Sequence, residues 1–221
     1  MKKLLLSIFA ATTVATFQAT AITVTVNQVA GYYVSDGEFN VSPIIGSGYG
    51  AADLYNNNSG ALGFGTFCID RGLSITVPGT YTATVISSGI DPNNGNQISL
   101  GTAWLFQQFA QGVLANYNYT PGVNRANSAY LLQNAIWVLE GQIGNNFSDI
   151  FLTMVTTQFG TLVAAEADNN QKYDVGVLGL TGANGAPAQP MLTLLPDGGS
   201  ALLLLGMSLS GLALISSKMR A

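Results

Sequence analysis

The sequence predicts an α+β fold, in which a β-rich, sandwich- or barrel-like domain carries an inserted helical block. Apolar and polar residues alternate in the first part of the chain, as they do in half-buried strands. The middle of the chain changes to the spacing of amphipathic helices, and alternation returns near residue 173. Strands followed by helices and again by strands indicate a single domain with one helical block.

Alternation and β-branched or aromatic residues mark the expected strands. In the first half of the chain, the tight connection Arg71-Gly72 and the turn Pro78-Gly79 separate neighbouring strands. Segments 46–63 and 91–97 are rich in Gly and Asn and are expected to be linker-like. The strands are expected at residues 22–26, 65–70, 73–77, 81–85, 173–178 and 191–194.

Three helices are expected between these strands. Apolar residues at helical spacing predict helices over 99–115 and 127–140, and Gly141 is the expected C-cap of the second. A third helix is expected over 148–167, with Asp149 in its first turn. Together these helices form the inserted block.

The N-terminus has the features of a secretory signal peptide in their usual order. Lys2 and Lys3 form a basic start, an apolar run extends to about Ala15, and Ala19-Thr20-Ala21 is a small-x-small cleavage site. Residues 1–21 are therefore expected to be removed on export. The alternative is a short buried helix with a basic start.

The C-terminus has the features of a transmembrane helix. No residue from Gly198 to Ser217 is charged, and as a helix this segment would be about 30 Å long, enough to cross a bilayer core. Lys218 and Arg220 follow as a membrane stop, which predicts a cytoplasmic C-terminus. The alternative is a hydrophobic terminal core helix.

The short motif that precedes this span resembles a known bacterial sorting signal. Pro196, Asp197, Gly198 and Gly199, followed by the apolar span and the basic end, resemble the VPDSG-CTERM tail of the wider PEP-CTERM group, with Leu195 in place of the usual Val. The resemblance implies a bacterial protein that is exported and anchored for a time in the inner membrane. It also implies cleavage by an exosortase-type membrane protease and passage to the cell surface or the extracellular matrix.

These features give the expected domain plan. A signal peptide covers residues 1–21, the α+β domain covers 22–181, a linker covers 182–194, and the sorting signal with its helix covers 195–221.

The composition excludes several classes of function. The chain of 221 residues has 7 Lys and Arg, 11 Asp and Glu, and no His. It offers no basic surface for nucleic acid and no Ser-His-Asp centre. Because four of the basic residues lie in the terminal segments, the exported body is expected to be acidic.

The acidic residues do not indicate a metal site. Asp53 and Asp91 lie in Asn-rich loops, where they are expected to shape turns. The other acidic residues lack the spacing of a calcium-binding loop, although a calcium site built from separate loops stays open. We expect no resident metal, no cofactor and no enzymatic activity.

A single cysteine in an exported chain requires an explanation. Cys68 lies between Phe67 and Ile69 on an expected strand, where a buried cysteine can act as a small hydrophobe. Gln133 lies on an expected helix, with Tyr130 and Trp137 three and four residues away on neighbouring turns. Attack of the Cys68 thiolate on the Gln133 carboxamide, with loss of ammonia, would give an internal thioester.

The two blocks, Phe67-Cys68-Ile69-Asp70 and Gln133-Asn134-Ala135-Ile136-Trp137, resemble the thioester domains of bacterial surface adhesins. The resemblance implies Cys68 as the thioester sulfur, Gln133 as the acyl donor, and Trp137 and Tyr130 as the supporting shell. It further implies covalent adhesion to amine groups of a surface protein or matrix polymer. Two alternatives stay open: a non-covalent structural or matrix protein with Cys68 buried and inert, and, more remotely, a hydrolase.

Overall fold

The computed structural model describes residues 21–32, 36–56, 62–145 and 148–195. The sorting motif, the membrane stop, the expected transmembrane helix and all but the last residue of the expected signal peptide lie outside these ranges. Within them, no helix has both the length and the apolar character needed to cross a bilayer.

The described chain forms a mixed fold of one antiparallel sheet and a helical block. Seven strands follow the order β3-β4-β2-β1-β5-β6-β7, and every neighbouring pair is antiparallel. The predicted α+β class is therefore confirmed at this coarse level. The strands are β1 (Ile22–Asn27), β2 (Phe39–Ser42), β3 (Leu54–Asn56), β4 (Leu62–Thr66), β5 (Gly79–Ile86), β6 (Val175–Thr181) and β7 (Pro187–Leu194).

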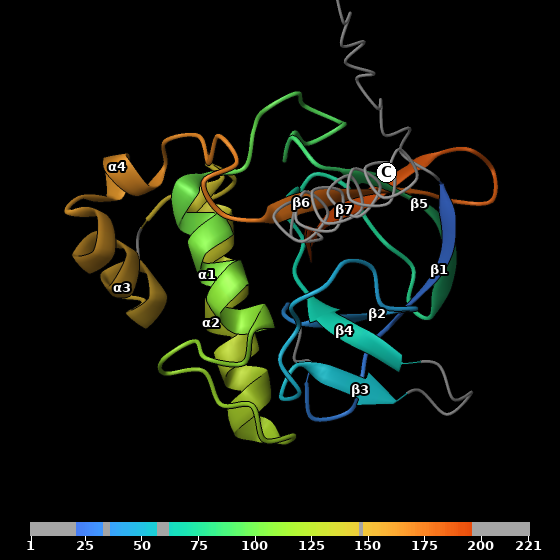
Figure 1. Cartoon of the computed structure of the whole chain (residues 1–221), viewed down its shortest axis with the longest axis horizontal. Coiled ribbons are helices and arrows are strands. Elements are labelled where there is room, and N and C mark those ends of the chain that lie inside the picture. Colours follow the sequence, from blue (N-terminus) through green and yellow to red (C-terminus); the bar gives the residue numbers. More distant parts are fainter. Residues whose placement is uncertain (1–20, 33–35, 57–61, 146–147, 196–221) are drawn as a thin grey trace, which may run out of the picture.

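The sheet curls until the chain that follows β4 meets β7 (Figure 1). The Leu192 N–H donates to the Phe67 carbonyl at 3.1 Å, and the Ile69 N–H donates to the Pro190 carbonyl at 3.2 Å. Cys68 lies opposite Met191 in the bridge between these two bonds. The curl therefore holds the cysteine against a strand that lies far from it in the sequence.

Four helices occupy the chain between β5 and β6 and lie on one side of the sheet, with α1 and α2 nearest to it (Figure 1). The Ser99 hydroxyl caps the first of them, and the Asp149 carboxylate caps the third, as side-chain acceptors for backbone N–H groups. The helices are α1 (Leu100–Ala110), α2 (Val123–Leu139), α3 (Ile150–Phe159) and α4 (Leu162–Ala165).

The apolar core has two parts that meet at the segment after β4. Phe67 and Ile69 belong to the larger cluster, which packs between the helices and the sheet. Cys68, which lies between them in the sequence, belongs to a second cluster made by strand residues such as Val41 and Met191. The alternation of a strand thus sends neighbouring side chains into different clusters.

Three predicted elements differ in the structure. Of the expected strand over 65–70, only residues 65 and 66 lie in β4, and Cys68 makes an isolated bridge to Met191. Residues 73–77 do not form a strand, because the Tyr81 hydroxyl takes up backbone groups of this segment: it accepts from the Thr76 N–H at 2.9 Å and donates to the Thr76 carbonyl at 2.8 Å. The expected helix over 148–167 is divided into α3 and α4 at Gly160, whose φ of 84° is not helical.

The expected linker over 182–194 is wrong. The Gly182 N–H donates to the Ala186 carbonyl at 3.0 Å, so the Gly- and Pro-containing stretch forms a turn. Strand β7 begins directly afterwards and pairs with β6. The folded domain therefore extends at least to Leu194, because most of β7 is buried in the core.

The segment 46–63 is also not a plain linker. It contains β3, and the Gly50 N–H donates to the Ala110 carbonyl at the end of α1 at 2.7 Å. A Cβ added at Gly50 would lie 2.1 Å from the Gln111 carbonyl oxygen, so this contact requires glycine. The segment is thus held against the helical block.

Candidate functional site

The structure brings the two halves of the expected thioester together. Cys68 follows β4 and pairs with β7, whereas Gln133 lies in the middle of α2. The Cys68 N–H donates to Gln133 Oε1 at 2.9 Å, and Gln133 Nε2 donates to the Cys68 carbonyl at 2.7 Å. One side-chain amide therefore spans both backbone groups of the residue that carries the only thiol of the chain.

Both residues are buried in this arrangement. Each has 1% of its surface exposed, and the segments that carry them come from opposite layers of the fold. A buried amide must have partners for its polar atoms, and the Cys68 backbone provides one for the oxygen and one for the nitrogen. The pairing fixes where the carboxamide lies relative to residue 68.

One face of α2 points toward the sheet. Arg125, Ala129, Gln133 and Trp137 follow one another at intervals of four residues and are all buried. The helix packs closely against the segment before β2 at Ala129, since a Cβ added at Gly37 would lie 3.2 Å from the Ala129 Cβ. Close packing one turn before Gln133 therefore helps to position the part of α2 that carries the carboxamide.

A cavity of about 340 Å³ lies beside the pair. Its lining includes Cys68 and Gln133, and it also includes Arg71 and Trp137 from the same two segments, Asp36 from the segment before β2, and Gln189 from β7. The cavity is partly open to solvent, so that small molecules can approach the buried pair from it.

The two residues expected to support Gln133 differ in position. Trp137 is 5% exposed and lines the cavity, and the Arg71 guanidinium lies 5.5 Å from the centre of its ring. Its Nε1 has no hydrogen-bond partner among the described residues. Tyr130 is 40% exposed and does not line the cavity.

The thiol is electrostatically unfavourable as a thiolate. Burial raises the pKa of Cys68 well above its ordinary value, and the charges of Asp36 and Asp70 raise it further. The thiol is therefore protonated at neutral pH, and a reaction of its sulfur as a nucleophile needs a local proton acceptor.

The hydrogen bond from the Cys68 N–H has a chemical consequence for the carboxamide. The donor points at Oε1, the atom on which negative charge would develop if a nucleophile attacked the Gln133 Cδ. A fixed backbone N–H in a buried site stabilises such an oxyanion more than water does. The arrangement can therefore support acyl transfer at Gln133.

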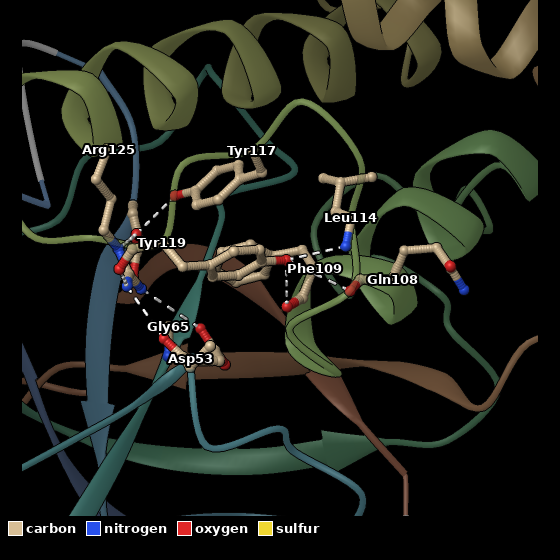
Figure 2. Close-up of polar contacts among 10 residues, drawn as sticks. Asp53, Gly65, Gln108, Phe109, Leu114, Tyr117, Tyr119 and Arg125 are labelled. Atoms are coloured by element: carbon tan, nitrogen blue, oxygen red, sulfur yellow. Dashed lines mark hydrogen bonds and ion pairs between the residues drawn. The ribbon is translucent and has the colours of Figure 1, made fainter.

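A second buried polar cluster lies on the same face of α2, two turns before Gln133. The Arg125 Nη2 and Nε bond to the two carboxylate oxygens of Glu38, at 2.7 and 2.9 Å, and both side chains are fully buried. The Tyr117 hydroxyl donates to Glu38 Oε2 at 2.7 Å. Figure 2 shows Arg125 extending from α2 toward Asp53, with Tyr119 beside it.

Asp53 is the second carboxyl group of this cluster, beside an arginine that is already paired with Glu38. Its Oδ1 lies 3.9 Å from Arg125 Nη2, and its Oδ2 accepts from the Gly65 N–H at 3.3 Å. Burial and the charge of Glu38 raise its pKa well above the ordinary value. The expected turn-forming role for Asp53 is therefore wrong, whereas Asp91 does shape its turn by accepting from the Asn93 N–H at 2.9 Å.

This cluster was hard to predict from the sequence. Arg125 has a helical position among small residues, and only the scarcity of basic residues in the body could have singled it out. A lone arginine on a buried face of a helix needs a buried carboxylate partner. Which acid supplies it depends on the tertiary fold.

The described residues contain no group of three or more His, Cys, Asp or Glu side chains arranged to hold a metal ion. No family model, no curated protein and no solved structure matches this chain. A function can therefore be inferred only from the residues of the site and their geometry.

Proposed function

We propose that Cys68 and Gln133 form an internal thioester and that the protein is an exported adhesin that binds amine groups of a target covalently. The observation that carries the proposal is the double hydrogen bond between the Gln133 carboxamide and the backbone of Cys68. It supports the proposal because it holds an acyl group against the backbone of the residue that carries the only thiol of the chain, and both residues line one cavity.

Formation of the thioester is an acyl transfer within the chain. Cys68 Sγ bonds to Gln133 Cδ, the bond from Cδ to Nε2 breaks, and the nitrogen leaves as ammonia with the proton of the thiol. The Cys68 N–H at Oε1 would stabilise the tetrahedral intermediate. The cavity offers ammonia a route out.

Attachment to a target is the second acyl transfer. A primary amine attacks the same Cδ, the bond from Cδ to Sγ breaks, and an amide joins Gln133 to the target. The thiol of Cys68 is regenerated. Because the chain is consumed in the reaction, the protein acts once and is not an enzyme.

A structural role for the pair is the competing proposal. The same hydrogen bonds would let Gln133 satisfy two backbone groups of Cys68 inside the core, with the thiol inert and the protein acting through non-covalent contacts. The cavity favours the thioester, because a glutamine that only satisfies buried backbone groups does not need a cavity with polar side chains beside it.

The mass of the intact full-length chain tests the thioester. We expect it to be lighter by one ammonia than the sequence mass after any signal-peptide removal, and to gain methylamine at Gln133. The control Cys68→Ser should have its full mass and should not react. A parent chain of full mass, with a titratable thiol and no methylamine adduct, would exclude the covalent adhesin.

The export route is a separate part of the proposal and rests on the terminal sequences. We propose that residues 1–21 direct export, that residues 195–221 anchor the chain in the inner membrane, and that an exosortase-type protease then releases it to the surface or matrix. These steps bring the acidic body to a place where surface proteins and matrix polymers are available.

Replacement of the sorting motif tests that route. In a host with an exosortase-type protease, Pro196→Ala together with Asp197→Ala should leave the protein uncut in the membrane fraction, because the protease no longer recognises its motif. The parent chain is the control, followed by immunoblotting of membrane and extracellular fractions. Equal release of both chains would exclude the proposed processing.

A further inference from the structure

We propose that Asp36 makes the site selective for cationic amines, so that the acyl acceptor is a primary ammonium group such as the lysine side chain of a target protein. This inference rests on the proposed thioester and concerns its partner. It depends on the position of Asp36 in the cavity and on the contrast with a neighbouring acid, Asp70.

Asp36 lies in the wall of the cavity that also exposes Cys68 and Gln133. It comes from the segment before β2, and Gly37 next to it packs against Ala129 of α2. Within the described part of the chain, the Asp36 carboxylate has no hydrogen bond and no ion pair, and it is only partly buried. It is thus available to a ligand that enters the cavity.

Asp70 is close to the same thiol but is placed differently. Its Oδ1 accepts from the Gly72 N–H at 2.7 Å, and it does not line the cavity. Both acids disfavour the Cys68 thiolate. Of the two acids, only Asp36 both acts on the Cys68 thiol and lines the cavity that the amine acceptor must enter.

A cationic amine matches this arrangement. The carboxylate attracts the ammonium group into a partly desolvated site, where opposite charges interact more strongly than in water. It can also accept one proton from the ammonium, which must lose a proton before its nitrogen attacks the Gln133 Cδ.

The protons and bonds balance in this step. The bond from nitrogen to Cδ forms and the bond from Cδ to Sγ breaks. Of the three ammonium protons, one stays on the amide nitrogen, one passes to the leaving sulfur of Cys68, and one passes through the Asp36 carboxylate to water. No further reactant is required.

Arg71 gives the opposite electrostatic contribution. It lines the cavity on the side of Trp137, is exposed, and carries a positive charge that repels an entering cation. The selectivity of the site should therefore change in opposite directions when Asp36 and Arg71 are neutralised. A loss of folding or packing would not produce such a reversal.

The experiment compares two nucleophiles of nearly equal size at neutral pH. Methylamine is a cation and hydroxylamine is uncharged, and both convert the thioester to products that intact-mass measurement separates. The quantity of interest is the methylamine rate divided by the hydroxylamine rate, measured on the full-length chain. Because hydroxylamine serves as an internal reference, a general change in access cancels.

We expect Asp36→Asn to lower this ratio by about tenfold and Arg71→Gln to raise it by about threefold. Asp70→Asn is the matched control and should leave it unchanged. Added salt should lower the ratio of the parent chain but not that of Asp36→Asn, because ions screen the charge. Arg71→Gln and the salt series test the proposal even if Asp36→Asn does not fold.

The outcomes separate the two proposals. A parent chain that lacks the thioester overturns both the thioester and the selectivity. A thioester in the parent and in Asp36→Asn, with equal ratios, overturns the role of Asp36 alone. The role of Asp36 is also overturned if Asp70→Asn lowers the ratio of methylamine to hydroxylamine rates as much as Asp36→Asn does, or if that ratio does not depend on salt in the parent chain.

Discussion

At the scale of single residues, the two polar clusters of α2 differ in what they offer to chemistry. Gln133 is a neutral group that satisfies the backbone of Cys68 beside a cavity. Arg125 is a charge that is fully buried with Glu38. The first cluster is suited to a reaction, and the second is suited to fixing the helix that carries the first.

Removal of Arg125 tests the second role. Arg125→Met should lower the free energy of unfolding by about 3–5 kcal/mol, because it leaves the Glu38 carboxylate buried without its cation. Urea denaturation measures the loss. Arg71→Met is the matched control and should change stability by about 0.5 kcal/mol or less, since Arg71 is exposed. Equal losses in the two variants would contradict a supporting role for the buried pair.

At the scale of secondary structure, α2 is the element on which the site depends. It packs closely against the segment before β2 where Gly37 meets Ala129, one turn before Gln133. Helix positions that are four residues apart move together, so a displacement at Ala129 is passed on to the carboxamide. The yield of thioester should therefore respond to packing at a residue that does not touch the reacting atoms.

Gly37→Ala tests this coupling. The added methyl group would lie 3.2 Å from the Ala129 Cβ and should push α2 away from the segment before β2, which lowers the fraction of chains that carry the thioester. Gly141→Ala is the control, because it also has a positive φ, of 67°, but no atom within 4 Å of the added group. Both variants should lose about 1 kcal/mol of stability from backbone strain. An unchanged yield of thioester in Gly37→Ala, measured by intact mass, would exclude the coupling.

The elements also show how far local pattern determines this fold. Strands β1 and β5 and the helices α1 and α2 were predictable, because their apolar residues repeat at the period of the element. Strands β2 and β3 are short, and their residues are strands only because neighbours supply hydrogen bonds. Segment 73–77 has a strand-like sequence, but the Tyr81 hydroxyl takes up the backbone groups of Thr76.

The candidate site was predictable to a similar extent. Cys68 and Gln133 stand in recognisable local blocks, so their pairing could be proposed from the sequence. The other groups in the cavity wall could not be found in this way. Asp36 lies near Cys68 because β2 pairs with β4, and Gln189 reaches the same cavity because the sheet curls and brings β7 to Cys68.

At the scale of the whole molecule, the distribution of charge indicates the conditions under which the domain is most stable. All 11 acidic residues of the chain lie between Asp36 and Asp197, and several of them are buried. Burial raises the pKa of Asp53, Glu140 and Asp149, which makes their ionisation unfavourable in the folded state. Such groups stabilise the folded state most where they are protonated.

The pH dependence of unfolding follows from these shifts. An acid whose pKa is raised by folding binds more protons in the folded state than in the unfolded state, so its contribution is fully present below the unfolded pKa and is lost as pH rises through the folded pKa. For Asp53 the ordinary value is 3.8, so this loss begins near pH 4 and continues upward. We therefore expect the domain to be more stable in mildly acidic solution than at neutral pH.

Asp53→Asn tests the largest single contribution. The amide has nearly the shape of the protonated acid and no charge, so the variant should lose less stability than the parent chain as pH rises above about 4, by up to about 1.4 kcal/mol for each pH unit in which the two states differ by one proton. Urea denaturation over a series of pH values measures the difference. Asp174→Asn is the control, because that side chain is exposed, and its profile should follow the parent. If Asp53→Asn also followed the parent profile, Asp53 would have to be ionised in the folded protein, and the buried cluster would contain two negative charges for the single positive charge of Arg125.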